Sequence, residues 1–136
     1  MMQKQILIVA GKRKTAVAKA RVSKGTGKVF YNSLPSDELP FFHKLALKEP
    51  LAIAHDVLGK IDADIYIKTS GGGKEGQIQA ARLAIAKALV AFTKSQELRK
   101  AYLKYDRNML VADTRRKEPY KPGDSKARSK RQKSYR

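Results

Sequence analysis

The stretch that decides the fold is Asp62–Thr93, DADIYIKTSGGGKEGQIQAARLAIAKALVAFT. Its first part, Asp62–Thr69, alternates apolar and polar residues, which is the period of a half-buried β-strand. From Glu75 or Gly76 to Thr93, apolar residues recur at the spacing of one wide helical face. The three glycines Gly71–Gly73 separate the two patterns. The stretch therefore predicts a strand, a sharp turn and a long helix.

The glycine-rich loop lies between a strand and a helix, where phosphate-binding loops occur. It ends in Gly76-Gln77, so it has neither the P-loop ending nor the dinucleotide-binding spacing, and no nucleotide cofactor is expected. Two compatible interpretations remain. Either the glycines supply a turn with positive φ, or they let a nucleic-acid backbone approach the loop at Gly71, Gly72, Gly73 and Lys74.

Strand patterns precede this stretch. The β propensity of Gln3–Ala10 predicts a first strand. Thr15–Ser23 alternates small apolar residues with a basic face, and Lys24–Lys28 predicts a hairpin turn that brings Val29–Tyr31 back as its partner. The face expected to be buried consists of Ala16, Ala18, Ala20 and Val22, and the opposite face of Val17, Lys19, Arg21 and Ser23.

Helical patterns fill most of the remaining chain. Ser36 is a predicted N-cap for a helix over Asp37–Lys48, and Pro50 opens a second short helix through Leu58 that Gly59 ends. Ser95 caps a predicted helix that runs to Tyr105. Met109–Ala112 is a predicted short strand. The side chains expected to point inward are Leu39, Phe42, Leu45 and Ala46 in the first helix, and Leu98, Tyr102 and Leu103 in the last.

This order of elements predicts an α+β fold, a two-layer α/β sandwich, over residues 1–113. The following segment, 114–136, contains ten basic residues against Glu118 and Asp124. A segment of this composition has too few apolar side chains to offset the entropy lost when the chain is ordered. We therefore expect an extended basic C-terminal tail that is disordered without RNA.

Charge indicates the kind of partner. Thirty Lys and Arg against twelve Asp and Glu give a formal net charge of +18, and the first acid is Asp37. Such an excess predicts a polyanionic partner. Within the domain, the candidate phosphate contacts form a basic stripe along one hairpin, made of Lys12, Arg13, Lys14, Lys19, Arg21, Lys24 and Lys28.

Composition excludes several other functions. The chain has no Cys and two His, which excludes a disulfide framework and a thiolate zinc site. His43 and His55 lack convergent partners, and Asp62 and Asp64 are expected to pair with neighbouring cations. No apolar run reaches the roughly 18 residues of a membrane span. We therefore expect a cytosolic protein without enzymatic activity, metal, cofactor, small-molecule substrate or membrane association.

Four segments, taken in order, resemble the universal small-subunit ribosomal protein S-nine family. The opening signature resembles Gly11–Ala18, and the glycine-rich signature resembles Gly71–Leu89. An Asp-x-Arg element resembles Asp113–Arg115, and the basic ending resembles Ala127–Arg136. The final Ser-Tyr-Arg is similar to that of archaeal and eukaryotic members, and the short N-terminus favours the archaeal ones. The stretch Glu118–Gly123 differs from the corresponding stretch in bacterial members of the family.

The resemblance implies a fold similar to the second domain of ribosomal protein S-five, which contains a left-handed β-α-β crossover. It implies binding to ribosomal RNA in the small-subunit head, beside neighbouring ribosomal proteins, in the cytoplasm. In the glycine loop and tail, the expected ribosomal RNA contacts include Gly71, Gly72, Gly73, Lys74, Arg115, Arg116, Lys117, Lys126, Arg128, Lys130 and Arg131. The expected contacts to the peptidyl-site transfer RNA are Lys133, Ser134, Tyr135 and Arg136.

The residues alone leave two other functions open. One is a basic DNA-binding or chromatin-associated module that uses the same hairpin and tail, in which the tail would also read as a nuclear localisation signal. The other is a nucleic-acid-processing enzyme, which is disfavoured because no convergent acid–base or metal-binding set is found.

Overall fold

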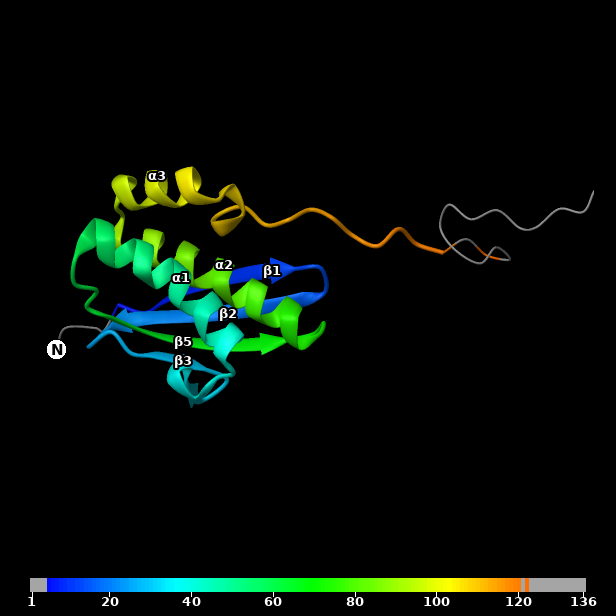
Figure 1. Ribbon diagram of the computed structural model, residues 1–136, viewed down its shortest axis with the longest axis horizontal. Coiled ribbons are helices and arrows are strands. Elements are labelled where there is room, and N and C mark those ends of the chain that lie inside the picture. Colours follow the sequence, from blue (N-terminus) through cyan, green and yellow to red (C-terminus); the bar gives the residue numbers. More distant parts are fainter. Residues whose placement is uncertain (1–4, 121, 123–136) are drawn as a thin grey trace, which may run out of the picture.

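The computed structural model describes residues 5–120 and 122. It contains one five-stranded sheet with α2 packed on β1 and β2, and with α1 and α3 packed beside α2 (Figure 1). The α+β architecture predicted from the sequence is therefore confirmed. The elements are β1 (Leu7–Arg13), β2 (Ala16–Lys24), β3 (Val29–Tyr31), β4 (Leu34–Pro35), η1 (Ser36–Glu38), α1 (Phe41–Leu58), β5 (Ala63–Ser70), α2 (Lys74–Thr93), α3 (Gln96–Tyr105) and η2 (Arg107–Met109).

One face of the sheet is covered and the other is open. The four residues of β2 that the alternation predicts to point inward are fully buried: Ala16, Ala18, Ala20 and Val22. Ile65 and Ile67 of β5 are buried beside them. These side chains are small on β2, so α2 approaches the sheet closely. At Gly11 a Cβ would lie 2.3 Å from the carbonyl oxygen of Ala80, so the helix backbone itself requires glycine there.

The strand order is β1-β2-β5-β3-β4, and it corrects the predicted hairpin. Val29–Tyr31 does not return beside β2, because β5 occupies that edge in an antiparallel pairing that runs from Val17↔Ser70 to Lys24↔Ala63. Instead β3 pairs with β5 in parallel. A three-residue strand cannot compete with the eight matched residues of β5, since each cross-strand pair adds stability.

A single helix, α1, replaces the two helices expected on either side of Pro50. Interior proline removes a helical hydrogen bond, but the Pro50 ring is buried and its carbonyl accepts a 2.7 Å bond from the buried Tyr102 hydroxyl of α3. Burial raises the pKa of that hydroxyl. Tertiary packing therefore holds a continuous helix that sequence preference would interrupt.

The start of α1 also differs from the prediction. Because Ser36–Glu38 forms a short 3-10 turn, the α-helix begins at Phe41 and its inward face is set by different residues. Phe42 is 79% exposed and Leu45 is 48% exposed, whereas Leu47 is buried. Two of the four predicted inward residues are therefore wrong. The remaining two, Leu39 and Ala46, pack against the core partly buried.

The other boundaries agree more closely with the sequence patterns. The Ser95 hydroxyl oxygen accepts a 3.3 Å bond from the Leu98 N–H, which confirms the predicted cap of α3. Leu103 is 41% exposed rather than inward. The predicted strand at Met109–Ala112 is wrong, because Met109 ends η2 and is fully buried. The first strand starts four residues later and ends three residues later than predicted.

Beyond η2 the chain leaves the domain, and residues 114–120 contain no helix or strand (Figure 1). Residues 121 and 123–136, which include most of the predicted tail, lie outside the described part. Within that described part, no helix is long and apolar enough to cross a membrane.

Candidate nucleic-acid interface

The open face of the sheet gathers cations from three strands. Lys19 and Arg21 of β2 are exposed there, as predicted, and Lys68 of β5 pairs directly with Lys19. Lys12 lies on the same face, because it is an even number of residues from Ile8, which pairs with Arg21. Lys28 belongs to the loop before β3, so the expected stripe along one hairpin is corrected to a stripe across β1, β2 and β5.

The basic run Lys12-Arg13-Lys14 is divided by the β1–β2 turn. Lys12 is exposed on the open face, and Lys14 is exposed in the turn with φ +51°. Arg13 points to the opposite side, where its guanidinium forms an ion pair with Asp113. Lys12 and Lys14 are thus available to an external anion, while Arg13 binds the segment that follows η2.

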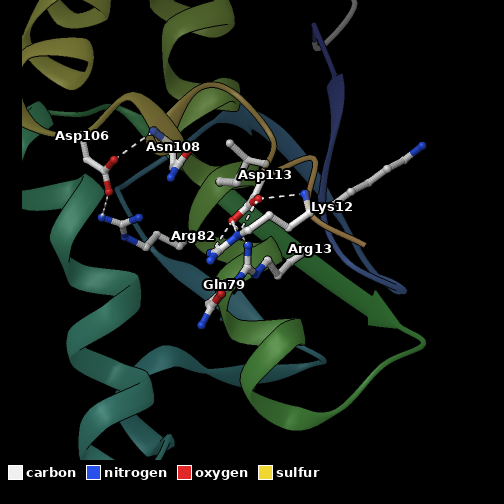
Figure 2. A pocket seen from close by; sticks show the side chains of 9 residues that line it. Lys12, Arg13, Gln79, Arg82, Asp106, Asn108 and Asp113 are labelled. Atoms are coloured by element: carbon white, nitrogen blue, oxygen red, sulfur yellow. Dashed lines mark hydrogen bonds and ion pairs between the residues drawn. The ribbon is translucent and has the colours of Figure 1, made fainter. Parts of the chain in front are cut away.

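Asp113 is the centre of a polar cluster at the side of the domain (Figure 2). Its carboxylate accepts bonds from Arg13 and from Arg115, whose Nη2 lies 2.7 Å from Oδ2. The Arg115 side chain and backbone N–H, together with Arg13, lower the pKa of Asp113. The Asp-x-Arg element therefore fastens the start of the tail to β1, a hundred residues earlier in the chain.

A second ion-pair group borders the same cluster (Figure 2). Arg82 of α2 donates a 2.8 Å bond to Glu49 of α1 and lies 3.6 Å from Asp106. Partial burial raises the pKa of Glu49, but the bonds from Arg82 and Tyr105 outweigh that effect and lower it overall. These contacts join three helices, so Arg82 serves the fold rather than an external ligand.

The glycine loop packs against the β1–β2 turn. Gly71 and Gly72 have φ +72° and +63°, and a Cβ on Gly72 would lie 2.9 Å from the Ala16 Cβ. The Gln77 side chain donates a 3.0 Å bond to the Gly71 carbonyl. The turn interpretation is therefore confirmed for these two glycines. Gly73 has open space around it and Lys74 is exposed, which leaves room for a backbone to approach.

The candidate acids and histidines make other contacts: His43 Nε2 lies 2.8 Å from Glu75 Oε1, and His55 Nδ1 lies 2.8 Å from the Gly59 carbonyl oxygen. Asp64 accepts bonds of 3.0 to 3.1 Å from the N–H groups of Thr26, Gly27 and Lys28, and these, that of Lys28 foremost, lower its pKa. It was expected to pair with a cation, as Asp62 does with Lys60 at 3.5 Å. In the described residues, no group of three or more His, Cys, Asp or Glu could hold a metal ion.

The tail residues that the structure describes are exposed. Arg116 donates to the backbone carbonyls of Asp113 and Arg115, and the Lys117 ammonium lies 4.4 Å from the centre of the Tyr120 ring. The other predicted tail contacts lie outside the described residues: Lys126, Arg128, Lys130, Arg131, Lys133, Ser134, Tyr135 and Arg136.

Sequence reasoning missed three residues of the open face. Tyr66 and Lys68 alternate outward on β5, and Phe30 is their neighbour on β3. The Phe30 and Tyr66 rings stack with centroids 5.0 Å apart, and the Arg21 guanidinium lies 5.0 Å from the Tyr66 ring centre. The signal was the outward side of the alternation in Asp62–Thr69, where partners were predicted only for Asp62 and Asp64.

Known proteins are similar over nearly the whole chain. The family model described as Ribosomal protein S9/S16 matches residues 11–136. Small ribosomal subunit protein uS9 of Methanococcus vannielii is 44% identical over 135 residues, covering 97% of this chain and 99% of that protein. The protein of the same name from Pyrobaculum aerophilum is 46% identical over 133 residues, covering 97% and 92%. The chain belongs to the ribosomal protein S9/S16 family.

Proposed function

We propose that this protein is a structural constituent of the small ribosomal subunit and binds ribosomal RNA in the subunit head. The observation that carries the proposal is the family match over residues 11–136, since it includes both the sheet domain and the basic tail. The named relatives are small-subunit proteins. The chain is accordingly a ribosomal protein and not an enzyme.

The exposed cations support contact with RNA phosphates. Among the described residues, none of Lys12, Lys14 and Lys19 has a carboxylate oxygen within 4.0 Å. Cations without an internal partner are the groups that neutralise phosphates and release counterions. The proposed ribosomal RNA contacts of the domain are Lys12, Lys14, Lys19, Arg21, Lys28, Gly73 and Lys74, with Arg13, Gly71 and Gly72 acting through the shape of the turn.

A separate surface suits a protein neighbour. Phe41 and Phe42 at the start of α1 are 68% and 79% exposed, and the exposed acids Asp37 and Glu38 precede them. Acids repel RNA phosphates, whereas exposed aromatic rings are favoured at protein interfaces. We assign this surface to a neighbouring ribosomal protein with apolar and basic side chains.

The tail is proposed to reach the peptidyl-site transfer RNA through Lys133, Ser134, Tyr135 and Arg136. Support comes from the family match, which extends to Arg136, and from the anchor at Asp113. That anchor fixes where the tail leaves the domain, and the segment 114–136 that begins there contains ten basic residues.

We also infer that the fold corresponds to the second domain of ribosomal protein S-five. The parallel neighbours β3 and β5 are joined through α1, which provides the β-α-β connection that such a correspondence requires. The cytoplasmic ribosome is then the expected location of the protein.

Identification of the nucleic acid that accompanies the tagged protein tests the proposal. The particles are washed at high salt, sedimented, and their RNA and DNA are identified. We expect small-subunit ribosomal RNA in a peak with small ribosomal particles. Genomic DNA without ribosomal RNA would instead favour a DNA-binding module and overturn the proposal.

A further inference from the structure

We infer that the open face of the sheet binds an unpaired RNA nucleotide, with its base against the Phe30–Tyr66 stack and its phosphate on Lys19 and Lys68. The inference rests on the proposed function, because it assumes that RNA is the partner. It adds Phe30, Tyr66 and Lys68 to the interface and specifies a single-stranded element rather than a duplex.

The aromatic stack is the first observation. The two rings are nearly parallel, with 6° between their planes and 5.0 Å between their centroids. Tyr66 is 39% exposed although it lies in the middle of the sheet, between β2 and β3. A sheet face that a helix covered would bury this ring. The stack is held rigidly by strand pairing, so little ordering entropy is lost when a base packs against it.

The lysine pair is the second observation. Lys19 and Lys68 are directly opposed on adjacent antiparallel strands, and like charges in that position destabilise a sheet. Among the described residues neither ammonium has a carboxylate within 4.0 Å. Arg21, two residues further along β2 on the same face, adds a third cation over Tyr66. A phosphate between the two ammonium groups would remove their repulsion, so the charges favour an anion.

The aromatic stack and the two lysines line the same hollow on the open face of the sheet. The hollow encloses about 530 Å³ and is lined by the aromatic rings, by Lys19 and Lys68, and by the Asn32–Thr69 hydrogen-bonded pair. The only acid on the outward positions of the described strands is Asp64, whose Oδ1 accepts three backbone N–H bonds near the far end of β5. Nothing in the hollow therefore repels a phosphate.

The combination of groups distinguishes the ligand. A duplex offers phosphates but keeps its bases stacked internally, so it would leave the aromatic rings unused. A single strand offers both a phosphate and an unstacked base, and base–aromatic stacking with a cationic border is the usual means of binding it. A protein partner would have to supply carboxylates to three cations, which the basic proteins of a ribosome supply poorly.

The test compares two substitutions at one position in the full-length protein. Tyr66→Leu keeps an apolar side chain but removes the ring, whereas Tyr66→Phe keeps the ring and removes only the hydroxyl. Affinity is measured by fluorescence anisotropy for a single-stranded RNA oligomer and for an RNA duplex of equal length, at several salt concentrations. Melting by circular dichroism confirms that both variants fold.

We expect Tyr66→Leu to weaken single-strand binding about tenfold, within the range for loss of one stacked base, with an unchanged salt slope. Tyr66→Phe should bind like the wild type, and duplex affinity should be the same for all three. Lys19→Gln with Lys68→Gln should instead reduce the salt slope by about 0.7, since the two lysines share one phosphate and single strands contribute about 0.7 per neutralised phosphate.

Three results would overturn the inference. One is equal single-strand affinity of Tyr66→Leu and wild type, and another is an equal loss for the duplex. The third is crosslinking of a photoreactive group at residue 66 to a protein rather than to RNA in assembled subunits. In each of these results the proposed function survives as long as the wild type still binds ribosomal RNA. Absence of RNA binding by the wild type would overturn both.

Discussion

At the scale of single residues, adjacent glycines of the loop have different requirements. Gly72 has φ +63° and almost touches Ala16, whereas Gly73 has extended backbone and open space where a Cβ would lie. The fold therefore requires glycine at the first position and not at the second. Substitutions at the two positions separate the two interpretations of the loop.

Gly72→Val is expected to destabilise the protein by about 1–3 kcal/mol, because a β-branched residue is strained at positive φ. Gly73→Ala is expected to leave the melting temperature nearly unchanged. Thermal melting measures both effects. If Gly73→Ala nevertheless weakens RNA binding, the open position at Gly73 admits an RNA backbone; unchanged affinity would mean that the loop is only a turn.

Asp113 is a single carboxylate that links the tail to β1 through Arg13 and Arg115. Its pKa in the folded protein is below the ordinary value. A carboxylate of this kind stabilises the fold above its unfolded pKa of about 3.9, and the stabilisation is lost as the pH falls through the folded pKa.

Asp113→Asn should therefore lower the melting temperature at pH 7, and the difference from wild type should shrink as the pH falls below about 4. The measurement is thermal unfolding at a series of pH values. Asp56→Asn is the matched control, because Asp56 is exposed on α1 without an ion pair among the described residues. A pH-independent difference would show that Asp113 acts by shape and not by charge.

At the scale of elements, the β1–β2 turn divides the basic run by strand parity. Side chains at neighbouring positions of a strand point to opposite faces. Lys12 is consequently exposed on the open face while Arg13 is used internally, and Lys14, which follows the strand, is exposed in the turn. A triple alanine substitution would mix loss of phosphate contacts with loss of the tail anchor, so the two effects need separate variants.

Lys12→Ala with Lys14→Ala is expected to reduce the slope of log affinity against log salt by about 1.4 to 1.8, the value for two neutralised phosphates. Filter binding to ribosomal RNA at several salt concentrations gives the slope. Lys60→Ala with Lys104→Ala removes the same charge away from the open face. An equal reduction in this control would show that net charge alone determines the salt dependence.

At the scale of the whole molecule, the domain and tail are proposed to act on different RNAs. If the domain contacts phosphates with many cations, as proposed, no single tail residue is needed for incorporation into the subunit. The Arg136 guanidinium can bind two phosphate oxygens, and a single charge-assisted contact of this kind contributes modestly. Its net contribution is expected to be about 1 kcal/mol.

Deletion of Arg136, or of Lys133–Arg136, should leave assembly intact and increase the dissociation of peptidyl-site transfer RNA several-fold, since about 1.4 kcal/mol is a factor of ten. Dissociation is measured on purified small subunits at fixed salt. Lys104→Ala removes one charge from α3 and should have no effect. If the truncated protein fails to incorporate, or dissociation is unchanged, the tail serves assembly instead.

Local patterns in the sequence determined much of this protein. The alternation of β2 and β5, the length of α2 and the Ser95 cap of α3 were all predicted, because each depends on residues within a few positions of one another. The concentration of cations away from the middle of the chain was likewise visible in composition. These features need no knowledge of which segments meet.

The tertiary structure alone decided which segments meet. Strand β3 lies beside β5 because the longer strand β5 occupies the edge of β2, and α1 continues through Pro50 because α3 packs on it. Arg13 faces Asp113 because strand parity directs it there. Each outcome depends on competition between contacts that are far apart in sequence, and local propensity carries no information about such contacts. The stack of Phe30 on Tyr66 and the opposition of Lys19 to Lys68 depend on strand pairing in the same way.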